Sequence, residues 1–248
     1  YTLTGALTWT NSLAFYKGTF DTGGFTLTGG QVLVSGLGSN TGTFKMNAST
    51  VNVSAWSPDS TITLDAGTST LNITGASTTF TGQGYTYYIV NFTNTSSNQA
   101  TTVTGSNTFN TFRVTTAASA PSFSSLTLSA NLTTSSLYLN ATSGAANNRL
   151  FITSNLIGTQ RTITTGGATQ AQCDYRGIRG SFDFTSALNN CGNCGGNSVL
   201  SFTAAKTVYW NLAGNQNWSA TGWATSSGGI PAVNNFPLAQ DRKSTRLN

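Results

Sequence analysis

The chain has 248 residues and a net charge of +5, with 7% charged, 38% hydrophobic and 11% aromatic residues. An average soluble domain carries about 25% charged residues; here Thr, Ser, Asn and Gly replace them, yet no apolar run approaches the ~18 residues that a membrane-spanning helix needs. Aromatic and aliphatic residues recur at strand spacing, so apolar burial can offset the entropy of ordering and disorder is excluded.

Short segments of alternating polar and apolar residues follow one another from the N-terminus to about residue 150. Alternation of period two is typical of strands with one buried and one solvated face. Turns such as Gly29-Gly30 and Asp65-Ala66-Gly67 separate them. No stretch shows a helical period with caps, so we predict an all-β chain. The predicted strands are residues 25–28, 31–34, 43–46, 50–53, 61–64, 70–73, 78–81, 87–92, 101–104, 111–115, 126–128 and 137–139.

Two of these strands share one pattern about 20 residues apart, the length of one repeat in a stacked array. Residues 49–54 read Ser-Thr-Val-Asn-Val-Ser, and residues 69–74 read Ser-Thr-Leu-Asn-Ile-Thr. A recurring strand that cannot bury its apolar face alone stacks on its neighbours. The strands are also not joined by two-residue Asn-Gly or Asp-Gly hairpin turns. We therefore predict a right-handed parallel β-helix (β-solenoid), with an antiparallel β-sandwich as the alternative.

The residue pattern changes after residue 147, and the three cysteines all lie in this later part of the chain. Residues 149–154 and 161–164 still resemble rungs, and Cys173 begins a more charged stretch. A zinc site for Cys173, Cys191 and Cys194 would need a fourth ligand in a chain without histidine, and a redox pair would need a βαβ setting. The alternatives that remain are a disulfide from Cys173 to Cys191 or Cys194, or buried thiols. We predict no metal and no cofactor.

Acid–base chemistry has few candidate residues, because the chain lacks both histidine and glutamate. Glycoside hydrolysis uses two carboxylates about 5–9 Å apart. The acids available for it are Asp21, Asp59, Asp65, Asp174 and Asp183. The first three lie in turn contexts, where an Asx-turn is the simpler interpretation. Asp174 is followed by Arg176 and Arg179, which indicates a surface ion pair on one strand face. We predict no catalytic residue, and therefore no enzyme.

Three of the five tryptophans, Trp210, Trp218 and Trp223, fall in the last segment. Tryptophan offers a flat apolar face and a donor, so these side chains are candidates for stacking on sugar rings. The alternative is a packed joint between modules. Spacings of eight and five residues, with a Gly-Asn turn in the first interval, favour the joint.

Both ends of the chain indicate a fragment of a longer protein, since it starts at Tyr1 and its one methionine, Met46, lies in a strand pattern. The last eight residues resemble one reading frame of a common sequencing-library adaptor, and we interpret residues 242–248 as an adaptor artefact. Setting aside those eight residues leaves eight basic and five acidic residues, a net charge of +3. The basic residues are scattered, which argues against a nucleic-acid partner.

The segment 206–241 resembles a tryptophan box that links β-helical modules in large phage tail or virion proteins, and similar boxes occur in secreted bacterial repeat proteins. Residues 67–76 and 105–110 resemble the preceding module. The resemblance implies a β-solenoid module over residues 1–205 and a linker, or the start of a next module, over residues 206–241. It carries over no catalytic residue. The matching residues of the box are Lys206, Thr207, Val208, Tyr209, Trp210, Asn217, Trp218, Ser219, Trp223, Ser227, Gly228, Gly229, Pro237 and Asp241.

This resemblance leads us to expect a non-catalytic structural and adhesive module of a phage tail or virion appendage that contacts host-surface glycans. One alternative is a bacterial cell-surface or secreted repeat adhesin, and another is a β-helical polysaccharide depolymerase. The expected partners are neighbouring modules of the same polypeptide, further copies in a homotrimer and cell-surface polysaccharide. Neither nucleic-acid binding nor membrane insertion is expected. The expected location is the virion, outside the cell, or alternatively the bacterial surface or medium.

Overall fold

The computed structural model describes residues 1–15, 17–34, 41–94, 98–115, 122–140, 148–184, 190–213, 216–218 and 220–245. Regular structure in these residues is almost entirely β-strand, with one short 3₁₀ helix, η2 (Val233–Asn235). The strands are β1 (Leu7–Thr8), β2 (Ser12–Phe15), β3 (Gly18–Asp21), β4 (Leu27–Val34), β5 (Gly42–Lys45), β6 (Thr50–Pro58), β7 (Thr63–Asp65), β8 (Thr70–Ile73), β9 (Thr79–Thr81), β10 (Thr86–Phe92), β11 (Ala100–Thr104), β12 (Thr108–Thr115), β13 (Ser122–Leu128), β14 (Leu132–Asn140), β15 (Asn148–Ser154), β16 (Arg161–Ala171), β17 (Cys173–Arg176), β18 (Ile178–Arg179), β19 (Asp183–Phe184), β20 (Gly192–Asn193), β21 (Ser201–Phe202), β22 (Thr207–Trp210), β23 (Trp223–Ala224) and β24 (Arg242–Thr245).

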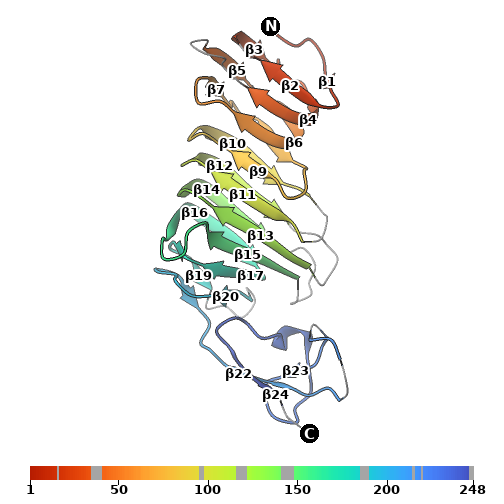
Figure 1. Cartoon of the computed structure of the whole chain (residues 1–248), viewed down its shortest axis with the longest axis vertical. Helices are drawn as coiled ribbons and strands as arrows, with labels where there is room; N and C mark the ends of the chain where they lie inside the picture. The colour runs from red at the N-terminus through yellow and green to blue at the C-terminus, as the bar shows by residue number, and fades with distance from the viewer. Residues whose placement is uncertain are drawn as a thin grey trace.

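The strands stack into a rod, a parallel β-solenoid of about six turns (Figure 1). Two faces form one sheet in the order β18-β16-β14-β12-β10-β8-β6-β9-β11-β13-β15-β17-β20. Strand β6 joins these faces, because residues 50–53 pair with β8 and Trp56 pairs with Phe80 of β9. Strands β3, β5 and β7 form a third face. The described ladders of this sheet are parallel. The predicted β-solenoid is confirmed, and the alternative antiparallel β-sandwich is wrong.

The repeated pattern read from the sequence is a register between neighbouring rungs. Residues 50–53 of β6 pair one to one with residues 70–73 of β8, so that Asn52 lies beside Asn72. Their apolar neighbours point inward and continue in both directions along the rod. This inward column consists of Leu27, Val51, Leu71, Val90, Phe112 and Leu137, each at most 1% exposed. Burial of each side chain contributes about 1.5–3 kcal/mol, which no single rung obtains alone.

Aromatic rings form a second part of the interior. Phe20 and Phe44 stack on consecutive rungs with ring centroids 5.4 Å apart. Trp56 is fully buried and meets Tyr87 edge to face at 6.3 Å. Its Nε1 donates to Tyr87 Oη at 3.0 Å, and Tyr87 Oη donates to the Gly82 carbonyl at 3.0 Å. The polar atoms of these large side chains are therefore satisfied inside the core, as buried polar groups require.

A glycine pair that was predicted as a turn lies inside a strand. The sequence placed strands at residues 25–28 and 31–34, separated by Gly29-Gly30, but the structure has one strand, β4. A Cβ on Gly29 would lie 2.2 Å from the ring of Trp9, and one on Gly30 would lie 2.0 Å from the Asn11 carbonyl oxygen. The glycines are needed for the close approach of the preceding rung rather than for a turn.

The chain continues beyond the solenoid into a terminal lobe that contains β22, β23, η2 and β24, at the lower end of Figure 1. Strand β22 pairs antiparallel with β23 and parallel with β24. Residues 242–245 thus form a strand in the structure, residues 246–248 lie outside the described part, and the adaptor interpretation stays a prediction. So does the division of the chain at residues 205 and 206. In the described residues no helix is long and apolar enough to cross a membrane.

Candidate functional site

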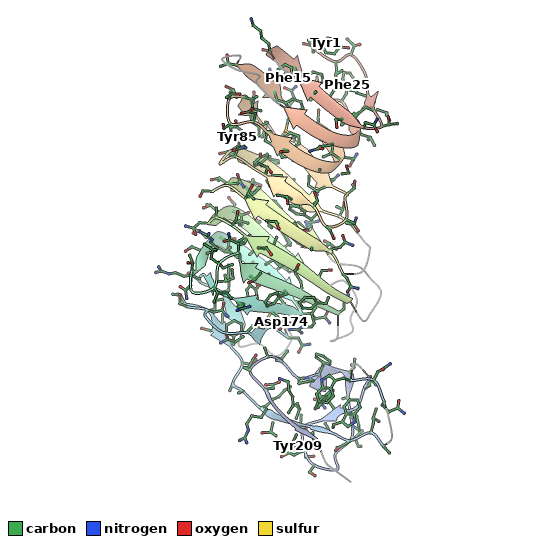
Figure 2. All side chains as sticks on the ribbon, in the orientation of Figure 1. Tyr1, Phe15, Phe25, Tyr85, Asp174 and Tyr209 are labelled. Carbon is green, nitrogen blue, oxygen red and sulfur yellow. The ribbon has the colours of Figure 1, made fainter. Side chains whose placement is uncertain are left out.

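The C-terminal third of the chain brings together most of the side chains that the sequence singled out. Figure 2 shows Asp174 near the C-terminal end of the rod and Tyr209 in the terminal lobe, with Tyr1, Phe15 and Phe25 at the opposite end. Three features can be described there: a tryptophan cluster, a cysteine column beside a buried ion pair, and a groove along the ends of successive rungs.

The three tryptophans contact one another in the terminal lobe. Trp210 and Trp218 stack with their ring centroids 5.7 Å apart and 9° between the ring planes. Trp223 meets both edge to face, at 5.2 Å from Trp210 and 4.6 Å from Trp218. Trp223 is 1% exposed, whereas Trp218 is 50% exposed. The cluster is therefore the small core of this lobe, with one tryptophan face left open to solvent.

Gln240 connects the terminal lobe to the last rungs of the solenoid. Gln240 Oε1 accepts from the Asn193 amide at 2.9 Å, and its Nε2 donates to the Cys191 carbonyl at 3.4 Å. The neighbouring Asp241 is buried, and its two carboxylate oxygens accept from the backbone amides of Lys206 and Leu238. These bonds fix the start of β22 against the end of the lobe.

Two cysteines lie in one inward column at the end of the rod. Asp174 of β17 pairs with Gly192 of β20, which places Cys191 one rung beyond Cys173. Both side chains are buried, their thiols are hydrogen-bonded to each other, and Cys194 is exposed. All three are reduced thiols here, and the disulfide from Cys173 to Cys191 or Cys194 stays a prediction. In the described residues no group of three His, Cys, Asp or Glu side chains could hold a metal ion.

The surroundings of the cysteines raise the pKa of two of them and lower the pKa of the third. Burial raises the pKa of Cys173, and the hydrogen bond from Cys173 lowers the pKa of Cys191. Cys194 is exposed, but partial burial of its sulfur raises its pKa to about 11. The Cys194 thiol is thus neutral at pH 7, and neutral thiols are poor nucleophiles.

A buried ion pair crosses two rungs beside the cysteines. Arg149 Nε donates to Asp174 Oδ2 at 2.8 Å, and Arg149 Nη2 donates to Asp174 Oδ1 at 2.6 Å and to the Cys173 carbonyl at 3.2 Å. The Arg149 side chain is 8% exposed, and its Nη1 has no partner among the described residues. The sequence placed the ion pair of Asp174 on its own strand, with Arg176 and Arg179. In a parallel solenoid the nearest partner lies one turn earlier instead.

Most of the candidate aspartates accept hydrogen bonds from nearby backbone amides or from an arginine. The Asx-turn interpretation is confirmed for three of them, because Asp21, Asp59 and Asp65 each accept from the backbone amide two residues on, at 2.8, 3.0 and 3.2 Å. The pKa of Asp21 is lowered by the hydrogen bond from the Gly23 amide, by that from the Asn47 side chain and by the charge of Lys45. Asp174 is held by Arg149, and Asp183 lies in β19. Carboxylates used in this way cap turns and neutralise a buried cation.

A groove that sequence reasoning missed runs along the ends of three rungs. This rung-end groove has a volume of about 670 Å³ and is lined by residues 153–154, 156–160, 176–177 and 194–196. Leu156 and Ile157 are 52% and 88% exposed at its wall. The lining comes from three segments that are far apart in the chain, so no local motif could have identified it. The one available signal was the exposed pair Leu156-Ile157 in an otherwise polar turn.

Comparisons with protein-family models, with curated proteins and with solved structures gave no match. The class that can be stated is the one that the fold defines, an all-β protein built on a parallel β-solenoid.

Proposed function

We propose that the chain is a non-catalytic structural and adhesive module of a phage tail or virion appendage. The module forms part of a rigid rod and contacts host-surface glycans. One observation carries the proposal: polar side chains on the outside of the rod are stacked in register like the apolar ones inside. The outward column on the β6–β8 face contains Asn52, Asn72 and Asn91. Their amides bond along the rod, Asn72 to Asn52 at 2.8 Å and Asn91 to Asn72 at 2.9 Å.

The same outward column continues with side chains suited to surface contact. Arg113 follows Asn91, and its guanidinium lies 4.6 Å from the ring centroid of Tyr138 on the next rung. A regular surface of amides, hydroxyls and stacked rings is rigid, because each side chain is held by its neighbour one rung away. It also offers donors and acceptors at a fixed repeat, which suits a repeating polymer such as a polysaccharide.

The use of the aspartates supports a non-catalytic role over the alternative of a depolymerase. Hydrolysis of a glycoside needs one carboxyl group able to donate a proton and a second near it. Asp21, Asp59 and Asp65 are committed to backbone amides of their own turns, and Asp174 is committed to Arg149.

The test is to incubate the purified chain with surface polysaccharides from a panel of bacteria and to measure both retention and newly formed reducing ends. We expect retention on at least one acidic or neutral polysaccharide without new reducing ends. New reducing ends above those of a protein-free control would instead establish the depolymerase. The absence of retention on every polysaccharide would remove the adhesive part of the proposal.

Whether the module belongs to a phage or to a bacterium is tested separately from what it binds. Capsid or terminase genes beside the coding sequence would support the phage appendage, and secretion or anchoring genes would support the bacterial adhesin. Light scattering adds a second criterion, because a trimer in solution would favour a tail fibre.

A further inference from the structure

We propose that the rung-end groove binds a carboxylated saccharide that carries acetamido groups, with Arg176 as the partner of the carboxylate. The proposal rests on the proposed function, since it names the kind of glycan that the module contacts and the place where it does so. The volume of about 670 Å³ is within the range of about 300–1,000 Å³ usual for ligand sites.

The groove is shaped before any ligand arrives. Gln160 connects its two walls, since Nε2 donates to the Gly196 carbonyl at 2.7 Å and Oε1 accepts from Ser198 Oγ at 2.7 Å. Arg161 closes the base of the turn 155–160 with two bonds to Asn155 Oδ1, at 3.1 and 2.8 Å. A site held open in this way avoids the ordering cost that flexible loops pay on binding.

The charge of the groove favours an anion with few charges. Arg176 is exposed, and it makes no ion pair within the part of the chain that the structure describes. The described lining residues include no acid. One cation without a local counterion fits one carboxylate, whereas a nucleic acid would need a row of cations.

The rest of the lining favours a saccharide with an apolar substituent. Thr159 supplies a hydroxyl. Those of Thr153 and Ser154 donate to the carbonyls of Ser154 and Leu156 and can still accept a hydrogen bond. Gly195 and Gly196 leave the backbone on one wall without side chains. Such groups exchange hydrogen bonds with sugar hydroxyls. The exposed aliphatic side chains of Leu156 and Ile157 would bury the methyl of an acetamido group, which contributes about 25 cal/mol per Å² removed from water. Among the described lining residues there is no aromatic ring, so we expect binding without stacking on a bare pyranose.

The probes are three acidic oligosaccharides, namely trimers of N-acetylneuraminic acid, tetramers of alternating glucuronic acid and N-acetylglucosamine, and trimers of galacturonic acid, each with its carboxyl-reduced counterpart. Titration of the full chain is followed by amide shifts in NMR and by calorimetry. We expect the strongest binding from an acetamido-bearing acid, with shifts at residues 153–160, 176–177 and 194–196. Carboxyl reduction should weaken that binding about tenfold or more, as the loss of a charged hydrogen bond does.

Two exposed arginines provide a matched pair of variants. Arg176→Gln should lose about tenfold in affinity for the acid and nothing for the reduced sugar. Arg179→Gln removes the same charge from an exposed residue of β18 outside the groove and should leave affinity unchanged. Ile157→Asn should weaken the acetamido acids but not the galacturonate. All three side chains are exposed, so each variant is expected to fold.

The outcomes separate the groove from the wider function. Equal loss in both arginine variants, equal binding of acid and reduced sugar, or shifts outside the groove would overturn the proposal. So would the absence of binding by all three acids. If the chain is nevertheless retained on bacterial polysaccharide, only the groove assignment has failed; if retention is also absent, the adhesive function has failed with it.

Discussion

At the scale of single residues, asparagine is suited to the outside of a solenoid because its amide both donates and accepts. Asn72 does both at once, to Asn52 on one side and from Asn91 on the other. A valine or alanine in the same column would end the chain of bonds. Threonine makes a longer bond, since Thr28 in the preceding rung accepts from Asn52 Nδ2 at 3.4 Å. The chain of amide hydrogen bonds ends at Asn91, whose buried Oδ1 has no partner among the described residues.

Replacing the central member of this column should therefore cost more than its exposure suggests. In Asn72→Ala both neighbouring amides lose a partner, and we expect a loss of about 1–3 kcal/mol in the free energy of unfolding in urea. The control is Asn110→Ala, at an exposed position of β12, which should change stability by about 0.5 kcal/mol or less. Equal effects of the two variants would show that the column does not stabilise the rod.

The buried ion pair gives a second residue-scale prediction. Asp174→Asn leaves the Arg149 guanidinium in a site where it is 8% exposed and without a counterion. We expect a loss of about 3–5 kcal/mol in unfolding free energy. Asp65→Asn makes the same chemical change in an exposed Asx-turn, where the amide oxygen can still accept from Gly67, and should be close to neutral. Equal losses would contradict the assigned role of Asp174.

Thiol reactivity follows from burial and pKa. Only Cys194 is exposed, and its pKa of about 11 keeps it protonated at pH 8. We expect one cysteine to react with a disulfide reagent in the native protein, at least about tenfold more slowly than an ordinary thiol at pH 8, because its rarer thiolate outweighs the higher nucleophilicity of that thiolate. Its rate should rise as the pH approaches 11, because the thiolate fraction grows. Mass mapping identifies the labelled residue, and rapid labelling of Cys173 would contradict its burial.

At the scale of elements, the strand period and the repeat were enough to predict which segments neighbour each other. The shared pattern at residues 49–54 and 69–74 gave both the strands and their register. The N-terminal strands β1, β2 and β3 were missed, since they are short and each pairs with one neighbouring strand only. Gly29-Gly30 was misassigned, because a single sequence does not distinguish a glycine for a turn from a glycine for close approach.

Candidate sites were less predictable than strands, because they depend on contacts between turns rather than on a local pattern. Contacts in a solenoid join residues about one turn apart, and the length of each turn depends on loops that carry no periodic signal. From the sequence we expected a surface ion pair of Asp174 with Arg176 and Arg179, but the register of β15 and β17 places Arg149 beside it. The Asx-turns were predictable, since their donor and acceptor are two residues apart.

The close approach at β4 can be tested directly. Gly30→Ala would place a methyl group 2.0 Å from the Asn11 carbonyl oxygen, so β2 and β4 would have to separate. We expect a loss of about 1–3 kcal/mol in unfolding free energy and faster amide exchange in β1 and β2. Gly5→Ala is the control, because its methyl group would meet nothing within 4 Å. Unchanged exchange in β2 would contradict the packing described.

At the scale of the whole molecule, each rung contacts mainly the rungs before and after it, so stability should vary along the rod. The strands β8, β10, β12 and β14 have a neighbour on either side, whereas β1, β2 and β3 lie at one end. We expect native-state amide exchange to be slowest in the middle strands and about a hundredfold or more faster at the end. A uniform exchange rate would indicate one cooperative unit instead.

The three mutually contacting tryptophans of the terminal lobe also have an optical consequence. Indole rings 4.6–5.7 Å apart in fixed orientations couple their electronic transitions, which gives a paired positive and negative band in the circular dichroism spectrum. The other two tryptophans, Trp9 and Trp56, lie in the solenoid. Trp56 contacts Phe44 and Tyr87, and within the described residues neither contacts another indole, so they contribute no such pair. The paired band therefore belongs to the terminal lobe alone, and its loss on heating reports the melting of that lobe separately from the backbone signal of the rod.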